Sequence, residues 1–232
     1  MNPARLSYLG PITARVGGGR RGSGVSGGRR DFHPLPLYPL RSRGGLVTML
    51  SLLIVPGYSG SGPRHWQTLW EQKLSFARRV EMPDWDHPDR RAWVEALDRA
   101  VAASAEPPVL VAHSCGVSTV VHWAAPGARP VRAALLVAPA DTESPSYPRE
   151  ASTFHPLPGA RLPFPSMVVA SANDPYCAPE RAEAFARAWG SRFIQAGPCG
   201  HINVDAGFGP WPEGERLLAA LIGEPVSRVF RA

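Results

Sequence analysis

The 232-residue sequence predicts a three-layer α/β fold in which a mostly parallel sheet lies between layers of helices. Two observations support this prediction. From Leu50 onward, short runs of apolar residues alternate with longer segments whose apolar residues recur at helical spacing. A chain of this length also suits one domain with a sizeable core. Strands that alternate with helices are typical of a parallel sheet covered on both faces.

The first expected elements begin the domain. The run LSLLIVPG (50–57) is mostly apolar, as in a strand buried on both faces. A helix over 65–74 is indicated by Trp66 and Trp70, which fall on one helical face. A second strand is expected over 78–83.

The middle of the domain contains the segment with the sharpest change of pattern. Residues 88–104 predict a helix, because Trp93 and Leu97 share an apolar face that follows a proline. The apolar run 108–113 predicts a strand, and a helix over 116–125 follows it at once.

The last part of the domain adds three strands and two helices. The strands are expected over 131–140, 166–171 and 192–197, each a short apolar run. The helices are expected over 179–190, which ends at a glycine, and over 213–224.

Residues 1–48 differ from the rest in composition. They are rich in Gly, Pro and Arg without helical or strand periodicity, so we expect a disordered extension ahead of a domain over 49–232. Met49 directly precedes the first strand, which favours an upstream extension of the gene or a dispensable tail. An RNA-binding arm, an organelle transit peptide and a twin-arginine export signal are the alternatives.

The net charge of +6 does not indicate a nucleic-acid-binding face. Residues 1–48 contain eight arginines and one acid, a net charge of +7, which leaves −1 for the remainder. We therefore expect no nucleic-acid partner for the domain. No apolar run approaches the ~18 residues of a membrane span, so no membrane association is expected.

The three cysteines, Cys115, Cys177 and Cys199, predict neither a disulfide framework nor a zinc site. Their number is odd and no C-x-x-C spacing occurs. The histidines likewise lack metal-ligand spacing. We expect no metal, no organic cofactor, and a reducing compartment such as the cytoplasm.

The segment PPVLVAHSCGVSTVVHWAA (107–125) places the small polar residue Ser114 between a buried strand and a helix. In open α/β sheets, ligands bind at the carboxyl ends of the strands. A sharp strand-to-helix turn exposes its central residue and requires small neighbours, here Ala112 and Gly116. The pattern A-H-S-C-G differs from the nucleophile elbow G-x-S-x-G by one methyl group. We interpret Ser114 as a nucleophile, with a helix N-cap as the simpler alternative.

Two further residues follow later strands in the order that a serine nucleophile requires. Asp174 and His201 each come just after an expected strand. His201 is expected to take the proton of Ser114, and Asp174 to orient the imidazole. Asp141 follows another strand and is a rival for the acid. His113, beside the nucleophile, is expected to support the site.

Backbone amides are expected to bind the oxyanion of the tetrahedral intermediate. The helix after Ser114 begins with the amide of Cys115, at the positive end of the helix dipole. A second donor is expected in the loop PGYSGSG (56–62), where a glycine permits close backbone approach. We predict the amide of Tyr58, with Ser59 as the alternative. The thiol of Cys115 is expected to pack in the core.

Five segments together resemble a known family: VPGYSGSGPRHWQTLWEQKL, MPDWDHPD, VLVAHSCG, SANDPYC and GPCGHIN. They resemble the small α/β serine hydrolases of the YdeN and retinoblastoma-binding-protein type, from about Met49 to the C-terminus. The resemblance implies an α/β-hydrolase fold with a minimal lid, a serine nucleophile and activity on simple esters. The retinoblastoma-pocket pattern L-x-C-x-E is absent, so that partner is not implied here.

The segment 138–165 is long for a connection in a compact domain and predicts a short cap. We expect Tyr147 and Phe154 at the mouth of the pocket. His65 and Trp66 are expected to fix the loop that carries the oxyanion donor.

The expected function is that of a serine hydrolase, carboxylesterase-like, which cleaves a carboxylic ester or related acyl bond of a small molecule through an acyl-enzyme. A non-catalytic binding or scaffold protein on the same fold is the alternative. The sequence leaves the oligomeric state open.

Overall fold

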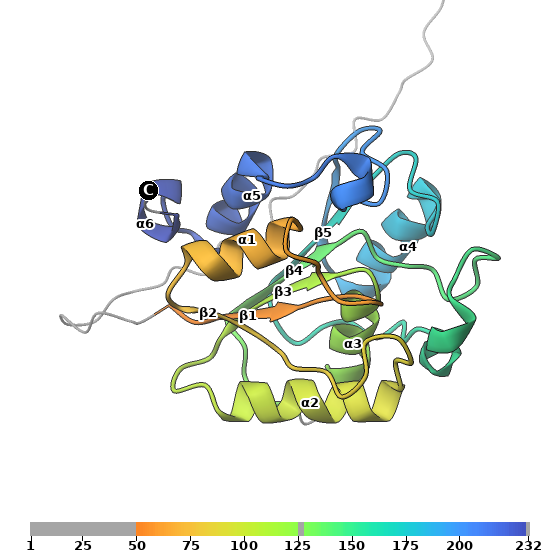
Figure 1. Cartoon of the computed structure of the whole chain (residues 1–232), viewed down its shortest axis with the longest axis horizontal. Coiled ribbons are helices and arrows are strands. Elements are labelled where there is room, and N and C mark those ends of the chain that lie inside the picture. The colour runs from red at the N-terminus through yellow and green to blue at the C-terminus, as the bar shows by residue number, and fades with distance from the viewer. Residues whose placement is uncertain (1–49, 125–127, 231–232) are drawn as a thin grey trace, which may run out of the picture. The chain divides into compact units, whose positions relative to one another are not determined.

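A computed structural model describes residues 50–124 and 128–230, and the expected extension over 1–48 lies outside them. Within these residues, six strands form one sheet in the order β2-β1-β3-β4-β5-β6 (Figure 1). Every neighbouring pair is parallel. The predicted α/β fold is confirmed, and this sheet is entirely parallel. The strands are β1 (Leu52–Val55), β2 (Ala77–Arg79), β3 (Val109–His113), β4 (Ala133–Val137), β5 (Ser166–Ala170) and β6 (Arg192–Gln195).

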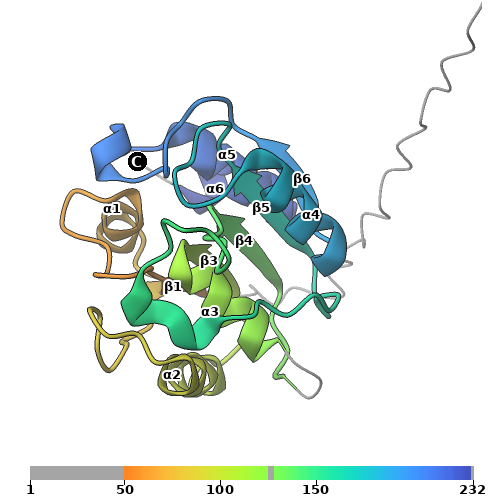
Figure 2. The ribbon, with the colours of Figure 1, turned by 90° about the vertical axis from the view of Figure 1, so that its right-hand side faces the viewer.

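Helices cover both faces of the sheet (Figure 2). One apolar core lies between the sheet and α2, α3 and α4, and a second lies between the sheet and α1, α5 and α6. The helices are α1 (Trp66–Lys73), α2 (Arg90–Ala102), α3 (Cys115–Trp123), α4 (Pro179–Trp189), α5 (Pro212–Ile222) and α6 (Val226–Val229). Two short 3-10 helices, η1 (Arg149–Phe154) and η2 (Val204–Ala206), lie in the connections.

The central strands β1, β3, β4 and β5 are buried at every position and almost entirely apolar, because both of their faces are covered. In β1, Leu52 and Ile54 belong to one core, whereas Leu53 and Val55 belong to the other. All four side chains are at most 1% exposed. A strand that alternated apolar and polar residues would place polar groups in one of the two cores.

Two element boundaries differ from the sequence prediction for local reasons. The second strand is β2 at 77–79 and not 78–83, because the ladder with β1 ends at the pair of Arg79 and Ile54. Helix α2 begins at Arg90, two residues later than expected, because Asp89 is its N-cap. The Asp89 carboxylate accepts a hydrogen bond from the Ala92 amide at 2.9 Å.

The order of the strands brings two loops together at one edge of the sheet. The chain runs from β1 to β2 on one side, and β3 then pairs with β1 on its other side. The loops that follow β1 and β3 are therefore neighbours at a topological switch point, where open α/β sheets bind ligands.

Candidate active site

Ser114 lies at a strained turn between β3 and α3. Its backbone has φ 56° and ψ −124°, a positive φ that non-glycine residues rarely adopt. A hydrogen bond from the Ser114 amide to the carbonyl of Val137 in β4 holds the turn at 3.1 Å. The Ser114 hydroxyl makes no N-cap hydrogen bond to α3. Ser114 thus occupies the N-cap position of α3 without capping it through its side chain. Strain of this kind costs on the order of 1–3 kcal/mol and persists where the surroundings enforce it.

Two glycines permit the turn because side chains at their positions would overlap the backbone. A Cβ atom at Gly116 would overlap the carbonyl oxygen of Val55 and lie 2.7 Å from that of Pro56. A Cβ atom at Gly57 would lie 2.7 Å from the Cβ of Ser114. The start of α3 and the end of β1 are thus in direct backbone contact, as close packing at the nucleophile requires.

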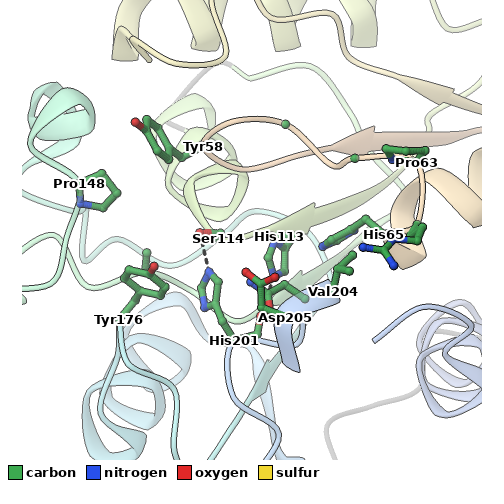
Figure 3. Close-up of a pocket in the computed structure, with 15 residues that line it drawn as sticks. Tyr58, Pro63, His65, His113, Ser114, Pro148, Tyr176, His201, Val204 and Asp205 are labelled. Carbon is green, nitrogen blue, oxygen red and sulfur yellow. Dashed lines mark hydrogen bonds between the residues drawn. The ribbon is translucent and has the colours of Figure 1, made fainter. Parts of the chain in front are cut away.

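The structure brings Ser114, His201 and Asp174 together in one chain of hydrogen bonds (Figure 3). The hydroxyl of Ser114 lies 2.8 Å from Nε2 of His201. The Nδ1 of His201 lies 2.8 and 2.9 Å from the two carboxylate oxygens of Asp174. Because a carboxylate only accepts, Nδ1 carries the ring proton and Nε2 accepts from the hydroxyl. The side chains of His201 and Asp174 are 8% and 2% exposed, so water does not separate the pair.

Asp141, the rival acid, is engaged elsewhere. Its two carboxylate oxygens accept hydrogen bonds from Arg181 at 2.7 and 2.9 Å. Burial would raise the pKa of Asp141, but the hydrogen bonds from Arg181 and from the Glu143 amide outweigh it and hold the pKa below its ordinary value. Of the two acids, Asp174 alone contacts the imidazole of His201.

Two residues without an expected role join the Asp174 loop to the His201 loop. The side-chain oxygen of Asn173 accepts hydrogen bonds from the Ser171 hydroxyl at 2.8 Å and from the Gly200 amide at 2.7 Å. The Ser171 hydroxyl in turn accepts from the Cys199 amide at 2.8 Å. Ser171 is fully buried, whereas the bond between Asn173 and the Gly200 amide is exposed, so the Ser171 hydroxyl is the protected part of this connection. Their only signal in the sequence is a run of small polar residues before Asp174.

The two expected oxyanion donors come from the adjacent loops after β1 and β3. A Cβ atom at Gly57 would lie 3.3 Å from the amide nitrogen of Cys115, which shows how closely the first loop passes the start of α3. Tyr58 follows Gly57 and lines the cavity. The alternative donor, Ser59, uses its amide in a 2.8 Å hydrogen bond to the carbonyl of Trp85. The geometry thus favours Tyr58 over Ser59.

His113 supports the His201 loop and is no candidate for the base. Its Nε2 donates a hydrogen bond to the backbone carbonyl of His201 at 2.8 Å. Burial lowers the pKa of His113 well below its ordinary value, so the ring is neutral. The next carbonyl, that of Ile202, accepts from Nε1 of Trp66 at 2.9 Å. Trp66 thus fixes the His201 loop, whereas the sequence indicated the oxyanion loop.

A cavity of about 340 Å³ opens in front of Ser114. Tyr58, Pro148 and Tyr176 lie on one side of Ser114, and Pro63, His65, Val204 and Asp205 lie on the other (Figure 3). Further lining residues are Gly60, Gly62, Arg64, His113, Ala140, His201 and Asn203.

The cap segment contributes less to the cavity than expected. Phe154 was expected at the pocket mouth, but it is fully buried and packs against Trp93 at a centroid distance of 5.9 Å. Tyr147 does not line the cavity either; its hydroxyl lies 3.6 Å from the thiol of Cys115. Both expectations were wrong, because the core beside α2 and α3 offers these rings more contacts than the rim. Ala140 and Pro148 are the residues of this segment that line the cavity.

Within residues 50–124 and 128–230, no group of three or more His, Cys, Asp or Glu side chains is arranged to hold a metal ion. In the same part of the chain, no helix has the length and apolar character needed to cross a membrane. All three cysteines are free thiols.

The chain was compared with known families and structures. The model of the serine hydrolase family matches residues 52–220. A YdeN-like hydrolase from Pectobacterium atrosepticum is 33% identical and superposes with a TM-score of 0.68, over 75% of this chain and 91% of that one. The ydeN product of Bacillus subtilis is 19% identical, with a TM-score of 0.66 over 76% of this chain and all of the other.

A more distant structure shares the fold alone. The carboxylesterase CesB of Bacillus subtilis is 15% identical, with a TM-score of 0.54 over 78% of this chain and 86% of that one. No curated protein gave a significant match. The family match spans most of the domain and includes the turn at Ser114, so the resemblance to YdeN-like hydrolases is confirmed. The chain belongs to the serine hydrolase family.

Proposed function

We propose that this protein hydrolyses a carboxylic ester or a related acyl bond of a small molecule through an acyl-enzyme on Ser114. The observation that supports the proposal is the hydrogen-bond chain from Asp174 through His201 to the Ser114 hydroxyl, with no distance above 2.9 Å. A serine hydroxyl becomes a nucleophile when a positioned base takes its proton, and this chain supplies the base and its orienting partner.

The reaction begins with attack of Ser114 Oγ on the acyl carbon, while Nε2 of His201 takes the hydroxyl proton. The imidazolium so formed is stabilised by the Asp174 carboxylate. Backbone amides of Tyr58 and Cys115 donate hydrogen bonds to the oxyanion.

The tetrahedral intermediate then collapses, and His201 returns the proton to the leaving group. Water, activated by the same imidazole, hydrolyses the acyl-enzyme and regenerates Ser114. No metal or organic cofactor takes part in these steps.

The solved structures with this fold include a carboxylesterase and a thioesterase, which act on acyl carbon. Their likeness to this chain is of fold alone, and they support acyl transfer as the chemistry of Ser114 only by analogy. The free thiols of all three cysteines are consistent with a protein of the cytoplasm, which we propose as its location.

Labelling with a fluorophosphonate probe tests the proposal directly. We expect the folded protein to be labelled at Ser114, with the modified peptide identified by mass spectrometry, and to hydrolyse p-nitrophenyl acetate. A folded protein that neither labels nor hydrolyses any ester of a short series would support the scaffold alternative and contradict the proposal.

The size of the cavity predicts a preference for short acyl chains. A volume of about 340 Å³ is near the lower end of the range for ligand sites, and of the cap segment 138–165 only Ala140 and Pro148 line it. We expect kcat/KM for p-nitrophenyl esters to fall at least about tenfold from butyrate to dodecanoate, because a long chain stays in water. A value that rises steadily with chain length would contradict this expectation.

The same substitution, Asp to Asn, should affect kcat very differently at Asp174 and at Asp141. Asp174→Asn should lower kcat by about 10³- to 10⁴-fold, because an amide does not hold the imidazole in the required tautomer. Asp141→Asn removes a carboxylate of the neighbouring strand end that binds Arg181, and should leave kcat within about twofold of wild type. Steady-state kinetics on p-nitrophenyl acetate measures both, with circular dichroism as a check on folding. Equal losses in the two variants would contradict the assignment of Asp174.

A further inference from the structure

The ring of His65 has one edge engaged in the fold and one edge without a partner. His65 is the N-cap of α1, and its Nδ1 accepts a hydrogen bond from the Gln67 amide at 3.2 Å. A neutral ring that accepts at Nδ1 carries its proton on Nε2. Among the described residues, Nε2 has no hydrogen-bond partner, and His65 lines the cavity in front of Ser114.

The ring of His65 is uncharged at neutral pH. Burial, as the largest cause, and the charges of Arg79 and His201 together lower its pKa to about 4. The residue is 5% exposed. Its Nε2–H is therefore a neutral donor, and it acts neither as a cation nor as a second base.

Packing fixes the position of this donor. The His65 ring contacts the rings of Trp66 and His113 at centroid distances of 5.3 and 4.9 Å. The His113 ring contacts that of His201 at 4.8 Å. His65 thus packs against His113, which in turn packs against His201, and it lies on the side of Ser114 away from Tyr58 and Tyr176 (Figure 3).

We propose that His65 Nε2–H binds an acceptor oxygen of the substrate, an ether or carbonyl oxygen close to the scissile bond, and so selects substrates that carry one. The inference rests on the ester hydrolysis proposed above. A site built to donate a hydrogen bond discriminates against the analogue without the acceptor, because the donor is then left buried and unpaired.

Two variants separate the structural edge of the ring from the substrate-binding edge. His65→Asn keeps an acceptor near the position of Nδ1, and Asn is a preferred N-cap, but it removes the donor at Nε2. His65→Gln places an amide donor near the position of Nε2 and removes the cap acceptor. Both variants lose the ring contacts with Trp66 and His113, so we expect both to have a lower Tm than the wild type. We expect the Tm of His65→Gln to lie about 2–4 °C below that of His65→Asn, because only His65→Gln also loses the cap acceptor.

Two pairs of esters test for the acceptor oxygen. The members of each pair have the same chain length, and only one of them carries an ether oxygen. On the acyl side, p-nitrophenyl methoxyacetate is compared with p-nitrophenyl butyrate. On the alcohol side, 2-methoxyethyl acetate is compared with butyl acetate. The intrinsic reactivity of each ester cancels when the kcat/KM ratio of a pair is compared between variant and wild type. In at least one pair, His65→Asn should lower the ratio by about two- to tenfold, whereas His65→Gln should preserve most of it.

The outcomes are distinguishable from failure of the proposed function. A wild type that neither labels with fluorophosphonate nor cleaves any of the four esters contradicts ester hydrolysis itself. A wild type that cleaves them with pair ratios unchanged in His65→Asn overturns the role of His65 alone. A lower pair ratio in both variants would also overturn the role of His65. The proposal expects the amide donor of His65→Gln to preserve most of the discrimination.

Discussion

Ser114→Ala should abolish fluorophosphonate labelling and lower kcat for p-nitrophenyl acetate by about 10⁴- to 10⁶-fold. The hydroxyl is the atom that lies 2.8 Å from Nε2 of His201, and a methyl group has no proton to give to that base. KM should change much less than kcat, because the lost interaction belongs to bond formation and not to binding.

The neighbouring thiol should not replace the lost nucleophile. Cys115 is fully buried, and burial raises the pKa of its thiol, so little thiolate forms at neutral pH. Cys115→Ser serves as the matched control and should retain labelling. Labelling that persists in Ser114→Ala and disappears in Cys115→Ser would show that the wrong residue has been assigned.

Gly116→Ala should destabilise the protein by more than about 3 kcal/mol. The added methyl group would overlap the Val55 carbonyl and lie 2.7 Å from that of Pro56. Neither carbonyl belongs to a flexible side chain, and β1 pairs with strands on both sides, so the backbone has little room to yield. The start of α3 would have to move away from β1, which displaces Ser114.

Urea unfolding measures this effect, and Gly159→Ala provides the control. Gly159 is exposed, and a Cβ atom there would meet nothing within 4 Å. The control should unfold within about 0.5 kcal/mol of the wild type. A Gly116→Ala protein as stable as the control would contradict the close contact between β1 and α3.

The sequence was most informative about the candidate site residues, because a polar side chain directly after an apolar strand has few structural roles. Ser114, Asp174 and His201 could be selected because each polar side chain follows an apolar strand, and parallel strands bring their carboxyl ends to one edge of the sheet. The choice between Asp174 and Asp141 required the structure, since both follow strands and only the position of Arg181 separates them.

Aromatic residues were harder to place from the sequence. Phe154 lies in an irregular segment, where no periodicity tells the core from the cavity rim, and it proved to be fully buried. The bonds of Ser171 and Asn173 also gave no pattern, because their partners, the amides of Cys199 and Gly200, are backbone groups on another loop. Nearly every residue carries a backbone amide, so the sequence does not indicate which amides a side chain will bind.

The placement of His201 after an edge strand has a consequence for how activity and folding relate. Among the described strands β6 pairs only with β5, its residues are half-buried or exposed, and the loop that follows it carries His201, whose Nε2 lies 2.8 Å from the Ser114 hydroxyl. Fraying of this one strand would loosen one end of the His201 loop, which is otherwise held through Trp66, His113 and Asn173, while the rest of the sheet stays paired. We therefore expect small changes at this edge strand to lower the proposed activity more than they lower the free energy of unfolding.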